Sequence, residues 1–379
     1  TGSIDAPVII RGMGGGRILF DGAGQRVNFR WDGSYGVIEN IDFYHKTRHV
    51  ISGHHLAFSN IGVRDPVHAF IDFNPVVNVS GHDVLIQRSE IGNNRRTSDL
   101  DSHGINAGSG SYNLWILDNE IYNNNGDAFQ GCHGCVADPP HHIYIGRNRL
   151  HDDRENAVDL KTIHDVVVSE NVMSGYSASA TSSGDAMVVG SNGFDAASNM
   201  GPRRIWVLHN QFQSSTRAIR IEGSEDVWVV GNVMTDVRSG LQIDNKPHRR
   251  IVVAANTFRQ VGSGLTAWGC QPTDLRVIGN ILDVVSGPHI GLIDCAGEAV
   301  ALHHNLFTGA GFAVRVDGIE HVTLASLEAT SFASDNHVAE APLDTSAELA
   351  GVYAEFELAW GRPIGVHAVQ DSATRHAPY

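Results

Sequence analysis

The stretch IWVLHN (205–210) recurs in altered form as VWVVGN (227–232), IVVAAN (251–256), LRVIGN (275–280) and VALHHN (300–305). In each copy a run of β-forming residues ends at an Asn, and successive Asn residues are 22 to 25 positions apart. Repeats of this length indicate stacked coils rather than a globule, because each unit buries its apolar face against the next one.

The same polar position also recurs toward the N-terminus. Its ten members are Asn60, Ser89, Asn119, Asn148, Asn171, Asn210, Asn232, Asn256, Asn280 and Asn305. The intervals are 22 to 30 residues, apart from one of 39 between Asn171 and Asn210. A polar side chain at such a turn can hydrogen-bond the backbone of the next coil, so we expect these residues to form an Asn ladder inside the stack.

A second strand follows each Asn after a polar turn, as in AVDLK (157–161), AIRIE (218–222) and GLQID (240–244). Both strands are rich in Val, Ile and Leu and lie between turn residues. No window keeps an apolar period of 3.6 residues, so helix is a minor component. The sequence predicts an all-β, single-domain parallel β-helix of about 11–12 coils, right-handed by the general rule for parallel crossovers.

The period is lost near residue 325. We therefore expect a parallel β-helix over 1–325 and an irregular C-terminal cap or tail over 326–379, because the ends of a solenoid need covering. Thr1 already lies inside what looks like a coil, so we expect an N-terminal segment to have been removed or to lie outside this sequence. A capped solenoid is expected to be stable as a monomer. No run of 18 apolar residues is present, so no membrane-spanning helix is expected.

The net charge of −15 argues against a nucleic-acid partner. An acidic chain that binds a polyuronate needs a local basic cluster or a bridging cation. Cys132 and Cys135 lie in GCHGC, and Cys270 and Cys295 are one coil apart. Two disulfides in a secreted or periplasmic bacterial protein is the interpretation we favour. The alternative is a zinc site formed by Cys132, His133 and Cys135.

Alternation along the second strands predicts one exposed face of the stack. Its outward residues are Asn106, Gln130, Asp159, Val188, Arg220, Gln242 and Thr266. Groups able to do chemistry gather on four adjacent coils, and they are Asp127, Glu155, Asn156, Asp159, Lys161, Asp185, Arg217, Arg220 and Glu222. The longest coil, between Asn171 and Asn210, lies here too, and its extra residues are expected to form loops beside a groove.

Three interpretations of this face remain open. The first is a solvated surface with cross-strand ion pairs, such as Lys161 with Glu222. The second is a calcium site, because carboxylate and amide oxygens from two adjacent turns are ligands that calcium prefers. The third is a catalytic base, in which a metal or Arg220 lowers the pKa of Lys161 so that its amine takes a proton at neutral pH. The last two are compatible.

At ENAVDLK (155–161) and NNGDAF (124–129) the chain resembles the β-helical polysaccharide lyases, locally the family nine pectate lyases and the family six alginate and chondroitin lyases. The family nine resemblance implies a calcium site, whose ligands would be Asp127, Glu155, Asn156 and Asp159. The family six resemblance implies that Lys161 is the base and that Arg220 in RIEGS is the arginine supplied by a later coil.

The resemblance implies β-elimination on a uronate-containing polysaccharide. Calcium or Arg220 would neutralise the uronate carboxylate, and Lys161 would remove the C5 proton. Because His103 is next to Asn106 and one coil before Asp127, its position near the groove makes it a candidate second acid or base. Substrate contacts are expected from Arg217, Asp185, Glu222, Asp244 and the exposed Trp268.

Three rival functions are a glycoside hydrolase that uses Asp127, Asp159 and Asp185, a C5 epimerase, and a non-catalytic carbohydrate-binding solenoid. The pair Asp152–Asp153 lies on a turn and is interpreted as structural. Trp115, Trp206 and Trp228 could either pack or stack on sugars.

Overall fold

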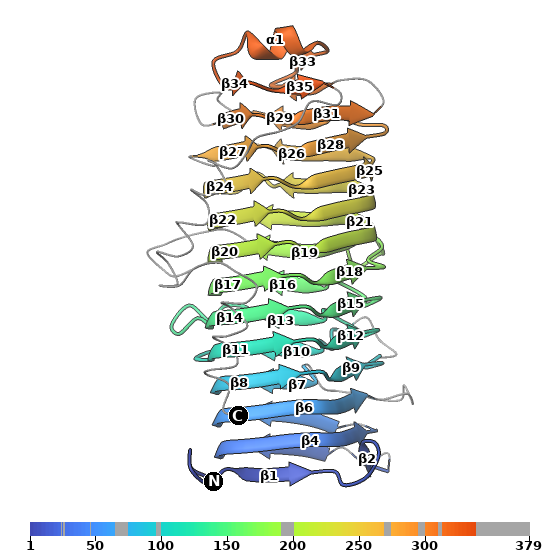
Figure 1. Cartoon of the computed structure of the whole chain (residues 1–379), viewed down its shortest axis with the longest axis vertical. Helices are drawn as coiled ribbons and strands as arrows, with labels where there is room; N and C mark the ends of the chain where they lie inside the picture. The colour runs from blue at the N-terminus through green and yellow to red at the C-terminus, as the bar shows by residue number, and fades with distance from the viewer. Residues whose placement is uncertain are drawn as a thin grey trace.

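The chain forms a stack of about 11 coils, drawn in Figure 1 from β1 (Val8–Arg11) at one end to α1 (Leu324–Glu328) at the other. The computed structural model describes residues 1–23, 25, 27–45, 47–64, 75–95, 100–190, 201–268, 274–294, 300–309 and 313–338. Each strand pairs in parallel with its equivalents in the coils below and above. The predicted fold, an all-β right-handed parallel β-helix, is confirmed.

The first sheet contains the strands that precede the repeated Asn. They are β4 (Ser34–Tyr44), β6 (His54–Arg64), β8 (His82–Gln87), β11 (Tyr112–Leu117), β14 (His141–Gly146), β17 (His164–Ser169), β20 (Arg203–Leu208), β22 (Glu225–Val230), β24 (Arg249–Ala254), β27 (Leu275–Ile278), β30 (Val300–His303) and β34 (Ala333–Ser334), with β1 paired to β4. Trp115, Trp206 and Trp228 are buried on this sheet, and the rings of Trp206 and Trp228 stack with centroids 4.9 Å apart. These tryptophans therefore pack and present no exposed face to a sugar.

The second sheet starts just after the Asn. It contains β2 (Ile18–Asp21), β9 (Glu90–Gly92), β12 (Glu120–Tyr122), β15 (Arg149–His151), β18 (Val172–Ser174), β21 (Gln211–Glu222), β23 (Val233–Ile243), β25 (Thr257–Val261), β28 (Ile281–Val284), β31 (Leu306–Gly309) and β35 (His337–Val338). Strands β21 and β23 continue around the corner into the third sheet, and β4 and β6 continue from the first sheet into the second.

The third sheet carries the face that the sequence singled out. Its strands are β3 (Val27–Trp31), β5 (Thr47–Ile51), β7 (Val77–Val79), β10 (Ile105–Ala107), β13 (Phe129–Gly131), β16 (Val158–Leu160), β19 (Asp185–Gly190), the ends of β21 and β23, β26 (Ser263–Trp268), β29 (Ile290–Ile293) and β32 (Val314–Val316), followed by the antiparallel β33 (Ile319–His321). Their inward residues, from Ile105 to Leu265, are fully buried. The inward positions predicted from alternation are therefore right.

A buried Asn ladder ties the coils together. From Asn119 to Asn305, each backbone N–H and each side-chain Nδ2 donates to Oδ1 of the Asn one coil further on, over 2.8–3.0 Å. Ser89 joins the start of the ladder through its N–H, and Asn336 extends it by one coil beyond the predicted set. These bonds satisfy turn amides that would otherwise be buried without partners.

The assignment of Asn60 to the ladder is wrong. The N–H of Ile61, not that of Asn60, donates to Ser89 Oγ, so Ile61 has the ladder position. Asn60 lies one residue earlier, with a φ of 50°, and its Nδ2 donates to Asn40 Oδ1. Asn tolerates the left-handed backbone conformation that this turn requires. In the sequence, Asn60 therefore looks like a ladder residue although it occupies a turn position.

A second, shorter ladder accounts for Asp153. Asn94 Nδ2 donates to Asn124 Oδ1, and the N–H and Nδ2 of Asn124 donate to Asp153 Oδ1. The Tyr176 hydroxyl donates to Asp153 Oδ2. Burial raises the pKa of Asp153 well above its ordinary value. Asp153 is therefore structural, as the sequence suggested.

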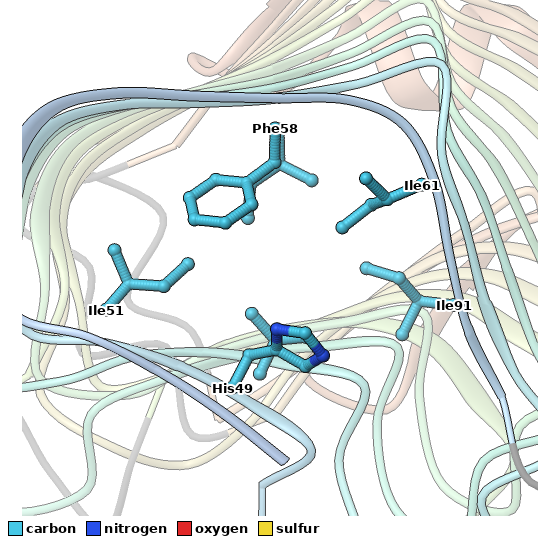
Figure 2. Close-up of a pocket in the computed structure, with 7 residues that line it drawn as sticks. His49, Ile51, Phe58, Ile61 and Ile91 are labelled. Atoms are coloured by element: carbon cyan, nitrogen blue, oxygen red, sulfur yellow. The ribbon is translucent and has the colours of Figure 1, made fainter. Parts of the chain in front are cut away.

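Side chains fill the interior of the coils. Figure 2 shows His49, Ile51, Phe58, Ile61 and Ile91 pointing inward. These residues line a cavity of about 10 Å³. A cavity of that size holds at most a single water molecule. Burial lowers the pKa of His49 to about 3, so this inward histidine is neutral. A ligand larger than a water molecule therefore has no room in this cavity.

One end of the stack carries the short helix α1 (Figure 1), whose Leu327 is fully buried in the core. Strands β34 and β35 pair in parallel with β30 and β31, so the stack continues to residue 338. The boundary at 325 and the cap over 326–379 stay predictions, since residues 339–379 lie outside the described residues. The structure contains no helix long and apolar enough to cross a membrane among the residues it describes.

Candidate active site

The third sheet aligns the predicted outward row coil by coil. Asn106 pairs with Gln130, Gln130 with Asp159, and Asp159 with Val188. The row continues through Arg220 to Gln242 and Thr266. The register predicted by counting residues is therefore correct, and Asp159 and Arg220 lie on either side of Val188.

A pocket of about 120 Å³ opens on this row. It is lined by His133, Asn156, Asp159, Lys161, Val188, Gly190, Arg220 and Glu222. Five of these were predicted site residues, whereas His133, Val188 and Gly190 were missed as such. A Cβ at Gly190 would lie 1.8 Å from the backbone oxygen of Glu222, so only a glycine fits beside Glu222 at this edge.

Lys161 and Asp159 form an ion pair in this pocket, with Nζ 2.9 Å from Oδ2. Asp159 is buried, and its Oδ1 has no hydrogen-bond partner among the residues that the structure describes. Burial, with the nearby charge of Asp127, raises the pKa of Asp159 to about 7 even though Lys161 opposes the shift. This carboxylate oxygen is therefore buried at the pocket wall without a hydrogen-bond donor among the described residues.

The pKa of Lys161 shifts in the direction opposite to our expectation. Burial alone would lower it, but the carboxylates of Asp159, Asp127 and Glu155 overcome that effect and raise it. The prediction that Arg220 depresses the pKa of Lys161 is wrong for the protein as it stands. Residues two apart on a strand share a face, so Asp159 is the nearer charge.

Arg220 crosses the pocket from the opposite side. Its Nε lies 2.9 Å from Asp185 Oδ2, and its Nη1 lies 2.9 Å from Glu222 Oε1 and 3.7 Å from Asp244 Oδ2. Arg217 pairs with the other oxygen of Asp185. These contacts hold the guanidinium in place, and they join all five residues in one network.

Two carboxylates of this network have raised pKa values. Burial raises the pKa of Asp185 against the opposing charges of Arg217 and Arg220. Burial and a hydrogen bond with Asp244 raise the pKa of Glu222 against Arg220. The sequence placed Glu222 and Asp244 in one row, but it did not reveal the raised pKa of Glu222.

A third group is formed by Glu155, in the coil of Lys161, with one residue from each of the two preceding coils. His103 Nδ1 is 2.9 Å from the N–H of Asp127 and 3.1 Å from Asp127 Oδ2. One imidazole nitrogen of His103 and one carboxylate oxygen from each of Asp127 and Glu155 lie within 4.8 Å of one another. Burial opposes the charged form of His103, but Asp127 raises its pKa. Burial, then Asp127 and Asp101, raise the pKa of Glu155 to about 7. The sequence thus placed His103 correctly beside Asp127.

The four predicted calcium ligands do not form one compact set. Asp127 accepts the N–H of Asn156 at Oδ1 and Gln130 Nε2 at Oδ2. Asn156 Nδ2 donates to the backbone oxygen of Asp185. Asp159 lies with Lys161 instead. The mixed set of His103, Asp127 and Glu155 differs from the all-oxygen shell typical of calcium, so calcium stays a prediction.

Two other predicted features lie around this groove. Trp268 is half exposed at the end of β26, two coils beyond Glu222. Cys132 and Cys135 are joined by a disulfide that brackets His133 at the pocket. The disulfide is confirmed, so these two sulfurs do not bind zinc. Cys270 and Cys295 lie outside the described residues.

No family model matches this chain, and no curated protein matches it. Solved structures do match. The A-module of the mannuronan C-5 epimerase AlgE6 of Azotobacter vinelandii is similar with a TM-score of 0.58 and 13% identity, over 89% of this chain and 91% of that one. A mannuronic acid specific polysaccharide family 6 lyase from human gut microbiota has a TM-score of 0.53 and 14% identity, over 94% and 84%.

A third similar structure is the catalytic domain of a GH87 α-1,3-glucanase in complex with nigerose, with a TM-score of 0.53 and 11% identity over 89% of this chain and 61% of that one. Identities this low establish the shared fold. The three structures differ in their reactions, so the chemistry of this chain has to be argued from its own pocket.

Proposed function

We propose that this chain is an enzyme that cleaves a uronate-containing polysaccharide by β-elimination in the groove of the third sheet. The observation that carries the proposal is the arrangement in one pocket of the Lys161–Asp159 pair and Arg220, on either side of Val188. The pocket thus holds an amine and a guanidinium close together. The amine suits the acidic C–H of a uronate ring, and the guanidinium suits its carboxylate.

Each residue has a stated role in this proposal. Arg220 pairs with the uronate carboxylate and stabilises the enolate-like charge that develops when C5 loses its proton. Lys161 takes the C5 proton, the C4=C5 double bond forms, and the C4–O4 bond breaks. The departing O4 takes a proton from a neighbouring acid, for which the candidates are Glu155 in the same coil as Lys161 and His103 two coils earlier.

Lys161 must first be a neutral amine. The negative charge of Asp159 holds its proton, so a group that neutralises Asp159 releases it. Because Asp159 has a pKa of about 7, its carboxylate can take up a proton at neutral pH. Protonation of Asp159 removes the charge that holds the proton on Lys161. Calcium remains part of the proposal as an alternative means of neutralising the uronate. No step of the proposed reaction depends on it.

A glycoside hydrolase is the second candidate. Glu155 and Asp159 both have pKa values of about 7, and a carboxylic acid that keeps its proton at neutral pH suits a general acid. Trp268, Arg217, Glu222, Asp185 and Asp244 would contact the polysaccharide in either case. A C5 epimerase shares the proton removal, and it differs only because C5 is then reprotonated on its opposite face.

The first test uses pectate, alginate, chondroitin and glucuronan, each with calcium or with chelator. Elimination produces an unsaturated uronyl end that absorbs ultraviolet light, whereas hydrolysis produces reducing ends without that absorbance. We expect absorbance on one substrate, and chelation then reports whether calcium is required. Reducing ends alone would replace the lyase with the hydrolase. Secretion, a periplasmic location and a monomeric state remain predictions.

A further inference from the structure

A second group of titratable side chains lies on the first sheet, where each coil enters its strand. The chain carries a pair of polar residues at this point in successive coils: His54–His55, His82–Asp83, Tyr112–Asn113, His141–His142, His164–Asp165 and Arg203–Arg204. The first members stack ring on ring, with centroid distances of 4.5–5.3 Å from His54 to His164.

The second member of each pair has a left-handed backbone conformation, with φ between 51° and 55° from His55 to Arg204. Such a residue breaks the strand's alternation, so its side chain can turn toward that of its neighbour. His54 Nδ1 accordingly lies 2.9 Å from His55 Nδ1, and His82 Nδ1 lies 2.7 Å from Asp83 Oδ2. Two coils thus bring three imidazoles and a carboxylate together.

We call His54, His55, His82 and Asp83 the first tetrad. One nitrogen or oxygen atom from each of His55, His82 and Asp83 lies within 4.8 Å of the others. His55 Nδ1 is 3.7 Å from Asp83 Oδ2. The side chains of His55 and His82 are about one third exposed, at 32% and 33%, so an ion can reach them from solvent.

The chain repeats the two side-chain pairs, but not the close set of three donor atoms, in a second tetrad, His141, His142, His164 and Asp165. His141 Nδ1 lies 2.6 Å from His142 Nδ1, and His164 Nδ1 lies 2.6 Å from Asp165 Oδ2. The next coil contributes Arg204, whose Nε and Nη2 each donate to Asp165 over 2.6 Å. Arg204 Nη2 also lies 3.3 Å from His164 Nδ1. The Arg204 guanidinium therefore hydrogen-bonds both carboxylate oxygens of Asp165, and its positive charge repels a metal cation.

The first tetrad has no such arginine in the equivalent place. Asn113 lies there, and its Nδ2 donates to Asp83 Oδ1 over 3.0 Å. This bond orients the carboxylate and leaves Oδ2 facing the two imidazoles. On the other side, the Tyr35 ring packs against His55 with centroids 4.7 Å apart. Both of these neighbours in the adjacent coils are neutral.

We propose that His55, His82 and Asp83, with His54 as a fourth donor, bind a divalent transition-metal ion of the zinc type. Imidazole nitrogen with a single carboxylate is the donor set that zinc, nickel and copper prefer, whereas calcium and magnesium prefer oxygen alone. An ion held by β6 and β8 would link two successive coils. It would act on a different sheet from the candidate active site, and so it is independent of the proposed function.

The test is titration of the metal-free protein with Zn²⁺ by isothermal titration calorimetry. His55→Gln and His82→Gln should each abolish binding of one equivalent of Zn²⁺ or lower its affinity at least about tenfold. His142→Gln and His164→Gln change the same positions of the second tetrad and should leave binding as in the wild type. Circular dichroism checks that all four variants fold. The groove cluster around His103 is unchanged in all four, so any Zn²⁺ that it binds remains.

Two exchanges test the role of the arginine. Arg204→Asn gives the second tetrad the residue found beside the first, and should add one equivalent of Zn²⁺. Asn113→Arg should weaken the first site by about 10–100-fold. The proposal is overturned if the wild type binds no Zn²⁺ up to about 0.1 mM, or if His55→Gln and His82→Gln bind as the wild type does. Failure of Arg204→Asn to add a site would overturn the argument from charge.

Discussion

Replacement of one residue of the Asn ladder measures how much the ladder stabilises the stack. Asn256 is fully buried, and its side chain takes part in four hydrogen bonds. Its Oδ1 accepts from the N–H and Nδ2 of Asn232, each over 2.9 Å. Its Nδ2 donates to Val229 O over 2.8 Å and to Asn280 Oδ1 over 3.0 Å. Asn256→Ala removes all four and leaves the N–H of Asn232 buried without a partner.

At about 1 kcal/mol for each hydrogen bond, Asn256→Ala should lower the free energy of unfolding by about 4 kcal/mol. Asn256→Ser should lower the free energy of unfolding by about half as much as Asn256→Ala does. The reason is visible in the ladder itself, where Ser89 Oγ accepts from the N–H of Ile61 and donates to Gln87 O. Serine thus keeps the acceptor that a neighbouring N–H requires.

The assay is urea unfolding followed by circular dichroism and tryptophan fluorescence, with coincident transitions as the test of two-state behaviour. The exposed Asn245 provides the control, and Asn245→Ala should change the free energy by no more than about 0.5 kcal/mol. A cost for Asn256→Ala as small as that of the control would refute the reasoning. So would equal costs for the Ala and Ser variants.

Three further predictions concern the groove. Lys161→Ala should lower kcat of elimination by about 10²–10⁴-fold with an unchanged circular dichroism spectrum, and retained turnover would exclude Lys161 as the base. Arg220→Ala should lower kcat/KM by about 10²-fold or more on uronates, and an unchanged kcat/KM would contradict its pairing with the uronate carboxylate. Burial, with Asp127 and Asp101, raises the pKa of Glu155 from 4.5 to about 7, so the folded state holds this proton to a higher pH than the unfolded state. That contribution to stability is present below pH 4.5 and is lost as the pH rises through about 7. Glu155→Gln should flatten the fall in Tm over this range, and an unchanged Tm profile would count against the raised pKa.

The fold could be predicted because its signal repeats. A polar residue every 22 to 30 positions marks one turn, and alternation by two fixes which side chains point inward. The prediction erred where this regularity breaks. Asn60 occupies a left-handed turn position next to the ladder, and Asn336 follows α1 after a longer interval that hides the period.

The candidate site could be located but not fully understood from the sequence. The outward row from Asn106 to Thr266 was right because strand register is set by the same repeat. The pKa of Lys161 depends instead on which charge is nearest, and Asp159 is closer than a residue two coils away. His133 was missed because it belongs to a turn shaped by a disulfide, where strand alternation gives no direction.

Removal of the C5 proton is the central chemical claim, and product analysis in D₂O tests it most directly. The substrate that responds in the absorbance assay is digested in D₂O, and the products are examined by NMR. Elimination should give new chain ends that have lost the C5 proton and carry a C4=C5 double bond. Deuterium at C5 of uncleaved chains would keep Lys161 as the base and make the enzyme an epimerase. Cleaved products that all retain the C5 proton would contradict the account and assign the groove to hydrolysis by Glu155 and Asp159.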